Sequence, residues 1–353
     1  MKKTVTQKGN PELIEALNAI EKEKDISKEI LLEAIENSLV AACKNEYGKA
    51  DNIRVSLDRE TGEFHVYQDK VIAEEAEDPM LHISLTEAEV KYPDKALGDT
   101  VSLEVTPKNF GRIAAQKAKQ VVVQKIREEE RKVLYDQYYT KEHDIVTGMV
   151  QRYSNGSYNI NLGKVDAVLT PQEQVSTEHF SSHDRIKLYV TEVKDTPRGP
   201  RIIISRTHPE LVKRLFESEV AEIQSGVVEI RNVSREAGSR SKIAVYSNNP
   251  DVDAVGACVG MNGARVNAVV DELYGEKIDI VEWNEDPAIF IEHALSPSKV
   301  ISVTVDPEEK SAQVIVPDYQ LSLAIGKEGQ NARLAARLTG YKIDIKSETQ
   351  SLV

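Results

Sequence analysis

One pattern of residues occurs twice in the second half of this 353-residue chain. The first copy begins with Gly260-Met261-Asn262-Gly263, continues through a segment with helical spacing, and ends in the motif G-x-K-I-D-I at Gly275 to Ile280. The second copy begins with Gly326-Lys327-Glu328-Gly329 and ends in the same motif at Gly340 to Ile345. Repetition at this level means that the chain carries one structural module twice.

The glycines of each copy indicate what the module does. Two glycines around two variable residues let the backbone turn sharply and present bare N–H groups at the start of a helix, a surface that suits a sugar-phosphate backbone. A single G-x-x-G more often serves only close packing of helices, but two copies in matching contexts favour binding. The first copy predicts a helix at 208–224, strands at 227–233 and 242–246, and then helix, loop, helix and strand. The second copy predicts strands at 299–305 and 312–316 and a helix at 319–325.

This order of elements resembles the KH domain, whose G-x-x-G loop clamps the backbone of single-stranded nucleic acid. The resemblance divides the second half of the chain into a first KH domain at 207–284 and a second at 285–353. The loops differ, since one carries a charge pair and the other none, so we expect unequal RNA affinity. The candidate RNA-binding residues of the two modules are Gly260, Met261, Asn262, Gly263, Arg265, Gly326, Lys327, Glu328, Gly329, Arg333 and Arg337.

Composition limits the class of protein. The chain has no apolar run long enough for a membrane span and no secretory core after its first lysines, which predicts a cytoplasmic protein. Cys43 and Cys258 form neither a C-x-x-C pair nor a disulfide framework. The net charge of −13 weakens the case for a nucleic-acid ligand and predicts little binding to duplex DNA, but the charge is uneven along the chain, and a KH groove depends on local patches.

Residues 141–206 predict a different module, with five short strands and glycine turns typical of a small closed barrel. The motifs Asp144 to Val150, Asn155 to Gly163, Asp184 to Lys187 and Ile202 to Arg206 resemble the S1 motif, an OB-type barrel that binds single-stranded RNA. Tyrosines would stack on bases and basic residues would track phosphates; cross-strand packing and solvated charge are the alternatives. The candidates are Arg152, Tyr153, Tyr158, Lys187, Arg198, Arg201 and Arg206.

The first 140 residues predict helical structure from residue 10 to 48, two strands joined by a turn at 53–72, a further strand at 100–105 and a long basic helix at 110–134. Basic residues of this helix gather near one face, so the helix could rest on RNA or on a protein. The alternative is a connecting helix with solvated charges.

The segment Ile26 to Glu36, the run Asn109 to Gln120, and the order of an S1 motif before two KH domains together resemble the NusA family of bacterial transcription factors. The resemblance covers essentially the whole chain. It implies an α+β multidomain protein with an α/β amino-terminal domain that includes a long helix, a five-stranded OB-type barrel and two tandem type II KH domains. It also implies that residues 1–140 bind RNA polymerase, with Arg112, Lys117 and Lys119 at the polymerase or the exiting RNA.

The implied protein is a cytoplasmic monomer that binds polymerase, nascent single-stranded RNA and other Nus factors, without a cofactor. It would modulate pausing, intrinsic termination and antitermination. An enzyme is not expected, because the chain lacks a phosphate-binding G-x-x-x-x-G-K-[ST] loop and a convergent catalytic set. His179, His183 and Asp184 are the most metal-like cluster but lack a third well-spaced ligand. An RNA chaperone without polymerase contact and a nuclease remain alternatives.

Overall fold

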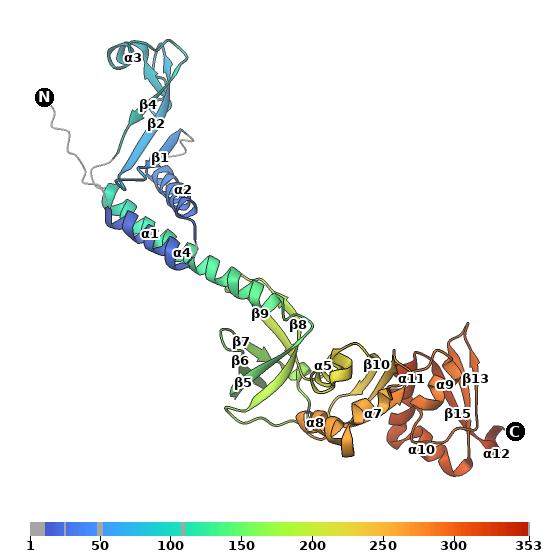
Figure 1. Cartoon of the computed structure of the whole chain (residues 1–353). Helices are drawn as coiled ribbons and strands as arrows, with labels where there is room; N and C mark the ends of the chain where they lie inside the picture. The colour runs from blue at the N-terminus through green and yellow to red at the C-terminus, as the bar shows by residue number, and fades with distance from the viewer. Residues whose placement is uncertain (1–10, 25, 48–51, 107–109, 352–353) are drawn as a thin grey trace. The chain divides into compact units, whose positions relative to one another are not determined.

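The computed structural model describes residues 11–24, 26–47, 52–106 and 110–351. The chain divides into two compact units, Met1–Val133 and Leu134–Val353, which are described one at a time. Figure 1 gives the labels of the elements. Within the described residues, no helix is both long and apolar enough to cross a membrane.

The first unit is a four-stranded sheet with helices at both ends of its sequence. Strand β2 (Phe64–Ala73) is central: it pairs antiparallel with β1 (Ile53–Leu57) and β4 (Thr100–Glu104) and parallel with β3 (His82–Ser84). The strands predicted at 53–72 and 100–105 are therefore confirmed, whereas β3 and the helix after it were not predicted. The helices are α1 (Pro11–Lys24), α2 (Lys28–Tyr47), α3 (Leu85–Lys91) and the start of α4 (Phe110–Tyr139).

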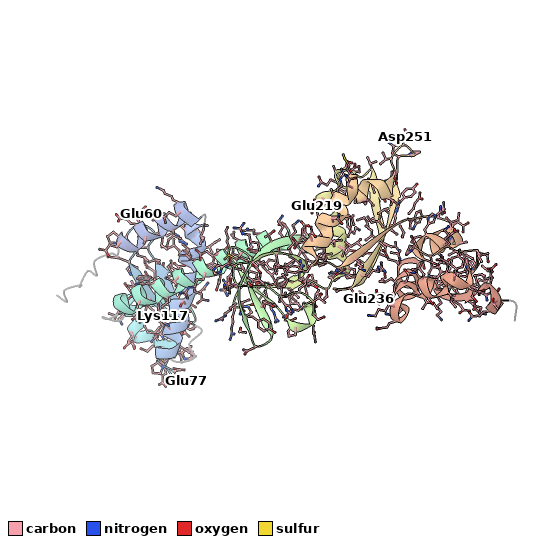
Figure 2. The ribbon with its side chains drawn as sticks, turned by 90° about the horizontal axis from the view of Figure 1, so that it is seen from below. Glu60, Glu77, Lys117, Glu219, Glu236 and Asp251 are labelled. Carbon is pink, nitrogen blue, oxygen red and sulfur yellow. The ribbon has the colours of Figure 1, made fainter. Side chains whose placement is uncertain are left out.

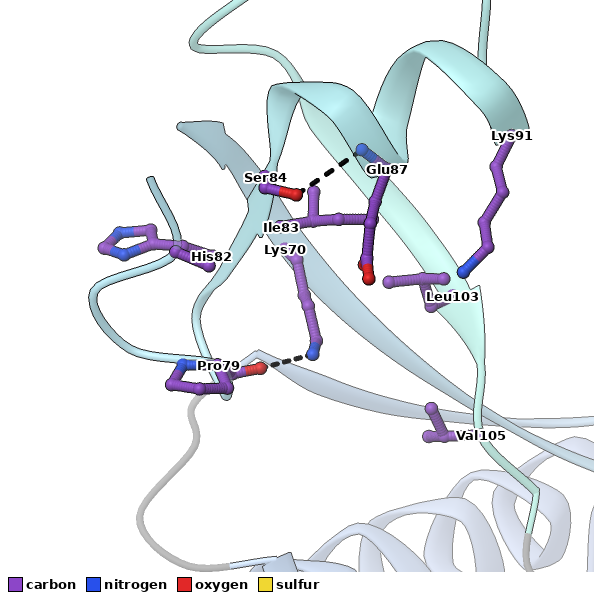
Figure 3. A pocket seen from close by; sticks show the side chains of 10 residues that line it. Lys70, Pro79, His82, Ile83, Ser84, Glu87, Lys91, Leu103 and Val105 are labelled. Atoms are coloured by element: carbon purple, nitrogen blue, oxygen red, sulfur yellow. Dashed lines mark hydrogen bonds between the residues drawn. The ribbon is translucent and has the colours of Figure 1, made fainter. Parts of the chain in front are cut away.

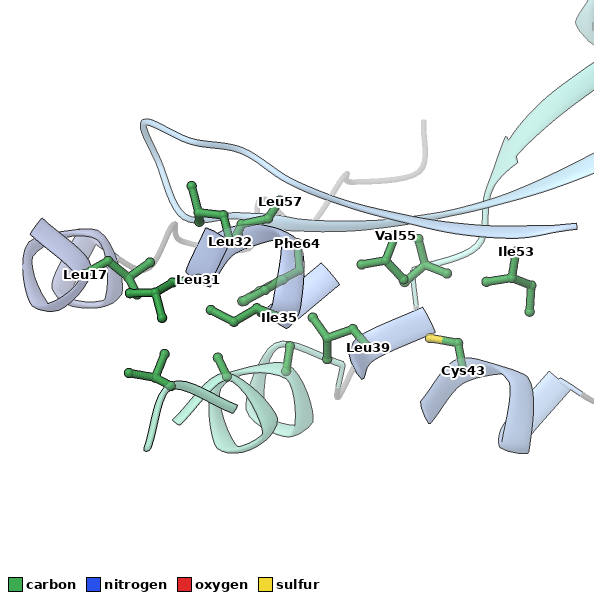
Figure 4. Packing of buried hydrophobic residues seen from close by; sticks show 14 of the residues in the cluster. Leu17, Leu31, Leu32, Ile35, Leu39, Cys43, Ile53, Val55, Leu57 and Phe64 are labelled. Atoms are coloured by element: carbon green, nitrogen blue, oxygen red, sulfur yellow. The ribbon is translucent and has the colours of Figure 1, made fainter. Parts of the chain in front are cut away.

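The main core of this unit lies between α2 and the sheet (Figure 4). Leu31, Ile35 and Leu39 recur at helical spacing on α2 and are fully buried, because this spacing places them on one face. From the other side, α4 adds Ala114 and Ala118, whose small side chains let the helix approach closely. The long helix is thus held by an apolar face within this unit, and Lys117 and Lys119 on the same helix remain exposed.

A smaller core around Ile72, Ile83 and Val101 holds the other end of the sheet. Beside it lies an open pocket of about 330 Å³ (Figure 3). Ser84 caps α3 by accepting a hydrogen bond from the backbone N–H of Glu87, and Lys70 Nζ donates to the carbonyl of Pro79. The pocket combines lysines with a glutamate and an apolar floor, which no residue pattern in the sequence had indicated.

The second unit begins with the five-stranded barrel. Its sheet runs in the order β7-β6-β5-β8-β9, and the two end strands approach each other, so that the barrel is nearly closed. Asn155 and Gly156 form the tight turn after β5, both with positive φ (51° and 76°), as an Asn-Gly hairpin turn requires. The predicted strands are confirmed, with bounds β5 (Ile145–Ser154), β6 (Ser157–Asn161), β7 (Asp166–Leu169), β8 (Arg185–Lys194) and β9 (Arg201–Ser205).

The two KH modules share one architecture. In each, two antiparallel strands are followed by two helices around the glycine loop and by a third strand parallel to the second. The first module consists of α5 (Pro209–Glu219), α6 (Ala221–Gln224), β10 (Val228–Glu236), β11 (Arg240–Ser247), α7 (Ala254–Val259), α8 (Ala264–Glu272) and β12 (Lys277–Glu282). The second consists of α9 (Pro287–Ala294), β13 (Ser302–Asp306), β14 (Ser311–Val316), α10 (Leu321–Ile325), α11 (Gln330–Thr339) and β15 (Lys342–Ser347). A short helix, α12 (Glu348–Ser351), follows.

Strand β10 contains a bulge that changes which side its residues face. The register slips between Ile230 and Asn232, so Arg231 has no partner on β11. Before the bulge, Val228 and Ile230 face the core of the first KH module; after it, Val233 is the residue packed against that core. Because side chains alternate along a strand, the extra residue turns Asn232, Ser234 and Glu236 to the opposite face.

Candidate nucleic-acid interface

The two glycine loops have the same backbone conformation. Gly260, Asn262 and Gly263 have φ angles of 73°, 52° and 77°, and their counterparts Gly326, Glu328 and Gly329 have 78°, 54° and 74°. Each loop is closed by a hydrogen bond from the N–H of its last glycine to the carbonyl of its first (3.1 Å in both). The sequence repeat therefore corresponds to a structural repeat.

The first glycine of each loop is required by space as well as by φ. A Cβ added at Gly326 would lie 2.8 Å from the backbone N of Asn331, and one at Gly260 would lie 2.8 Å from Cγ of Arg265. The tips, in contrast, are open: Met261 is 85% exposed, and Lys327 and Glu328 are exposed. The loops thus present variable side chains and backbone groups to solvent, as the KH resemblance predicts.

Beneath the first loop, Arg265 is held by the module itself. Its Nη1 donates to Oε2 of Glu222 (2.9 Å) and to the carbonyl of Ala257 (2.6 Å). Burial raises the pKa of the neighbouring Cys258 thiol to about 12, with a further contribution from Glu222. An RNA contact from Arg265 would have to share a guanidinium that already supports the loop.

The two basic residues predicted after the second loop, Arg333 and Arg337, both contact Glu236 of the first KH module. Arg333 Nε and Arg337 Nη2 donate to the same atom, Oε1, at 3.2 and 2.5 Å. Gln330 Nε2 donates to Oε2 of that carboxylate (2.8 Å) and also to Ser239 Oγ (2.7 Å). Figure 2 labels Glu236 at this seam between the modules. Hydrogen bonds from Gln330, then from Arg333, and the charges of both arginines hold the pKa of Glu236 below its usual value.

On the barrel, the two tyrosines predicted to stack on RNA differ. Tyr153 is 60% exposed and is available to a base. The prediction for Tyr158 is wrong, because its ring lies in the barrel core between Tyr153 (4.6 Å between centroids) and Phe180 (5.3 Å). The packing alternative applies to Tyr158, which supports the exposed ring of Tyr153 from behind.

Of the basic residues predicted on the barrel, Arg152, Arg198 and Arg201 are exposed and Lys187 is half-buried. The prediction that Arg206 contacts a phosphate is wrong, because its side chain is 0% exposed. Its guanidinium donates to both carboxylate oxygens of Glu178 (2.9 and 2.5 Å) and to Oε1 of Glu272 (3.1 Å). Burial would lower the pKa of Arg206, but the two glutamates raise it.

Arg206 is part of a seam that fixes the barrel to the first KH module. Glu178 comes from the barrel, whereas Glu272 ends helix α8, so the arginine joins the two modules through a charge network in which Arg206 and Glu178 are buried and Glu272 is partly exposed. Tyr189 of β8 stacks on His208 at the start of α5 (4.6 Å, 11° between planes) and packs into the core of the first KH module. The barrel and both KH modules therefore form one continuous structure within this unit.

In the first unit, Lys117 and Lys119 are exposed on α4, the helix that buries Ala114 and Ala118 (Figure 2 labels Lys117). The side chain of Arg112, predicted with them, lies outside the described residues. Among the described residues, no three histidine, cysteine or acidic side chains are grouped to hold a metal ion. The sequence did not indicate Glu236 or Gln330, which the structure places beside the second loop.

Comparison with known proteins covers nearly the whole chain. Three family models match: the NusA N-terminal domain at residues 12–132, the NusA-like first KH domain at 206–283 and the NusA-like second KH domain at 287–352. A solution structure of the N-terminal domain of NusA from Bacillus subtilis aligns with a TM-score of 0.32 and 53% identity, over 34% of this chain and 98% of that one.

Among whole proteins, the transcription termination/antitermination protein NusA of Bacillus subtilis is 57% identical over 340 residues, 96% of this chain and 92% of that protein. The protein of the same name from Thermus thermophilus is 40% identical over 95% of this chain and 89% of its own length. The order of modules, the paired loops and these matches agree. The chain belongs to the NusA family of transcription termination/antitermination proteins, whose members act as transcription factors and not as enzymes.

Proposed function

We propose that this protein binds RNA polymerase through its first 140 residues and holds nascent single-stranded RNA on the barrel and the two KH modules. In this way it modulates pausing, intrinsic termination and antitermination. The proposed modules are residues 1–140, 141–206, 207–284 and 285–353. Other Nus factors are further proposed partners, and the protein acts as a cytoplasmic monomer.

The observation that carries this proposal is the pair of loops in one conformation within one structural unit. Both loops combine an open tip with left-handed backbone at the same positions. Because the two KH modules that carry the loops are joined through buried contacts, RNA bound at one loop is held near the other. The second contact is then intramolecular, and the strand remains bound longer than on a single module.

The loops are tested by two double variants, Met261→Asp with Asn262→Asp and Lys327→Asp with Glu328→Asp. Aspartate tolerates the left-handed backbone of positions 262 and 328, so the fold is retained. We expect each to weaken binding of a single-stranded oligonucleotide by at least about fivefold, measured by fluorescence anisotropy, because the introduced charge repels phosphates. Thermal unfolding should be nearly unchanged.

The matched control is Glu309→Asp with Lys310→Asp. It makes the same two substitutions as the variant of the second loop, Lys to Asp and Glu to Asp, but in the exposed turn between β13 and β14. In this turn Lys310 also has positive φ (47°). This turn is bonded to Lys342, at the opposite end of α11 from the loop. Wild-type RNA affinity in both loop variants would refute the loop assignment.

The role in transcription is tested with purified polymerase. Residues 1–140 alone should be retained by polymerase, and the full chain should change the lifetime of a hairpin pause in a transcription assay. Retention only through residues 144–353 would favour the RNA chaperone alternative, and RNA degradation by the purified chain would favour a nuclease.

A further inference from the structure

The strongest unassigned feature is the polar cluster at the seam between the two KH modules. Gln330, Arg333 and Arg337 all belong to α11, which starts directly after the second glycine loop. Positions three, four and seven apart lie on the same face of a helix, so these three side chains point the same way. All three donate to one carboxylate, that of Glu236.

The acceptor has the chemistry of a phosphodiester. Its two oxygens share one negative charge: Oε1 accepts from both arginines and Oε2 accepts from Gln330. A phosphodiester likewise presents two acceptor oxygens that share one charge, and guanidinium groups recognise both anions through charge-assisted hydrogen bonds. The donors that hold Glu236 are therefore suited to an RNA phosphate.

The cluster is also within reach of a ligand. The side chains of Arg333 and Arg337 are 52% and 51% exposed, and Glu236 is 23% exposed. Arg333 Nη1 donates in addition to the carbonyl of Glu328, inside the second loop. From Gly329 to Arg337 the helix rises only about 12 Å at 1.5 Å per residue, so a strand bound at the loop passes next to the cluster.

We propose that Gln330, Arg333 and Arg337 form a phosphate site, that Glu236 occupies it in the RNA-free protein, and that one phosphate of bound single-stranded RNA replaces Glu236. This inference rests on the proposed function, because it needs RNA at the second loop. The exchange does not separate the modules. Asn232 Nδ2 still donates to the carbonyl of Leu338 (2.8 Å) and Lys242 Nζ to that of Ser296 (2.9 Å), and Ala244 and Val281 still pack with the second core.

A resident carboxylate lowers RNA affinity, because the phosphate has to displace it. In the full chain, Glu236→Gln and Glu236→Ala should bind a short fluorescein-labelled oligo-uridine about three to ten times more tightly at low salt. The plot of log affinity against log salt should also become steeper, by up to about 0.7 for one phosphate on a single strand. The reason is that the released carboxylate of the wild type takes up a cation and cancels part of the counterion release.

Glu219→Gln is the matched control, since it removes the same charge from the exposed end of α5. Its effect on affinity should stay clearly below that of Glu236→Gln. In a chain that also carries Arg333→Ala and Arg337→Ala, Glu236→Gln should give no gain.

Equal or weaker RNA binding by both Glu236 variants, with an unchanged salt slope, would overturn the inference and leave the cluster as a structural joint. The two proposals can fail separately. If the loop variants lose RNA affinity but the Glu236 variants gain none, only the phosphate site is refuted. If the wild-type chain binds no RNA, the proposed function fails first.

Discussion

The two seams of the second unit use the same chemistry in opposite surroundings. At the first, Arg206 bonds to Glu178 with side chains that are 0% and 1% exposed. At the second, Arg333 and Arg337 bond to Glu236 with half-exposed guanidinium groups. Breaking a buried pair leaves a charge without water, whereas breaking an exposed pair lets both groups solvate. The first seam therefore serves the fold, and the second is free to exchange partners.

The largest expected effect is at the buried seam. Arg206→Ala leaves Glu178 buried without its partner and should lower the free energy of unfolding by about 3–5 kcal/mol. Urea unfolding followed by the fluorescence of Trp283, the single tryptophan of the sequence, measures this loss. Arg198→Ala on the exposed barrel surface is the control and should change stability by less than about 0.5 kcal/mol. A loss below about 1 kcal/mol for Arg206→Ala would contradict the contrast between the seams.

The exposed seam should contribute much less to stability. Arg337→Ala should lower the free energy of unfolding by less than about 1 kcal/mol, because water replaces the carboxylate. The same urea titration measures it. A loss as large as that of Arg206→Ala would mean that both seams are structural, and the proposed exchange with RNA would become too costly.

The salt concentration should affect the contributions of the two seams to stability differently. Raising the ionic strength from about 0.1 M to 1 M shortens the screening length from about 10 Å to about 3 Å, which weakens exposed pairs more than buried ones. The stability difference between wild type and Arg337→Ala should therefore shrink, while that between wild type and Arg206→Ala should persist. Parallel changes in both differences would show that solvent reaches Arg206.

The smallest expected effect is the loss of the stability contributed by Glu236 at acidic pH. The pKa of Glu236 is held below its usual value, first by the hydrogen bond from Gln330, then by the hydrogen bond from Arg333 and by the charges of Arg333 and Arg337. A lowered pKa in the folded state gives stability that is present above the unfolded value and is lost as pH falls through the folded value. The difference between wild type and Glu236→Gln should thus be constant at neutral pH, begin to shrink near the ordinary glutamate pKa of about 4.3, and disappear as pH falls through the lowered folded value. A difference that grows in acid would contradict this assignment.

Strand alternation in the sequence could have predicted the buried residues of the barrel. Ile202, Ile204 and Arg206 occupy every second position, and all three are buried. Tyr158 likewise shares the inner face of β6 with Ile160. As residue types, Arg206 and Tyr158 suggested contacts with phosphates and bases. The alternation of residues along a strand determines which side each one faces, and it was the stronger signal.

The second seam could not be predicted in this way. Its members are far apart in sequence. In addition, the side of β10 on which Glu236 lies depends on the bulge at Arg231, which no residue pattern predicts. Helix α9 was also missed, because the second copy was predicted to begin with the strand at 299–305. Asp286 instead caps a helix that begins at Pro287, by accepting a hydrogen bond from the N–H of Ala288. The repeated loops and the order of elements were predictable because local sequence determines them.

The bulge in β10 makes Arg231 a residue that the alternation of the strand does not need. Deleting Arg231 would place Asn232 directly after Ile230 and restore simple alternation, in which Asn232, Ser234 and Glu236 keep their present face and Arg235 keeps its partner Glu276. A deletion of one residue after the bulge, between Val233 and Arg235, would instead exchange the inner and outer faces of part of the strand. In this family, therefore, we expect a gap of one residue in a comparison of sequences to be tolerated at the bulge and in the turn after β10, and excluded between them.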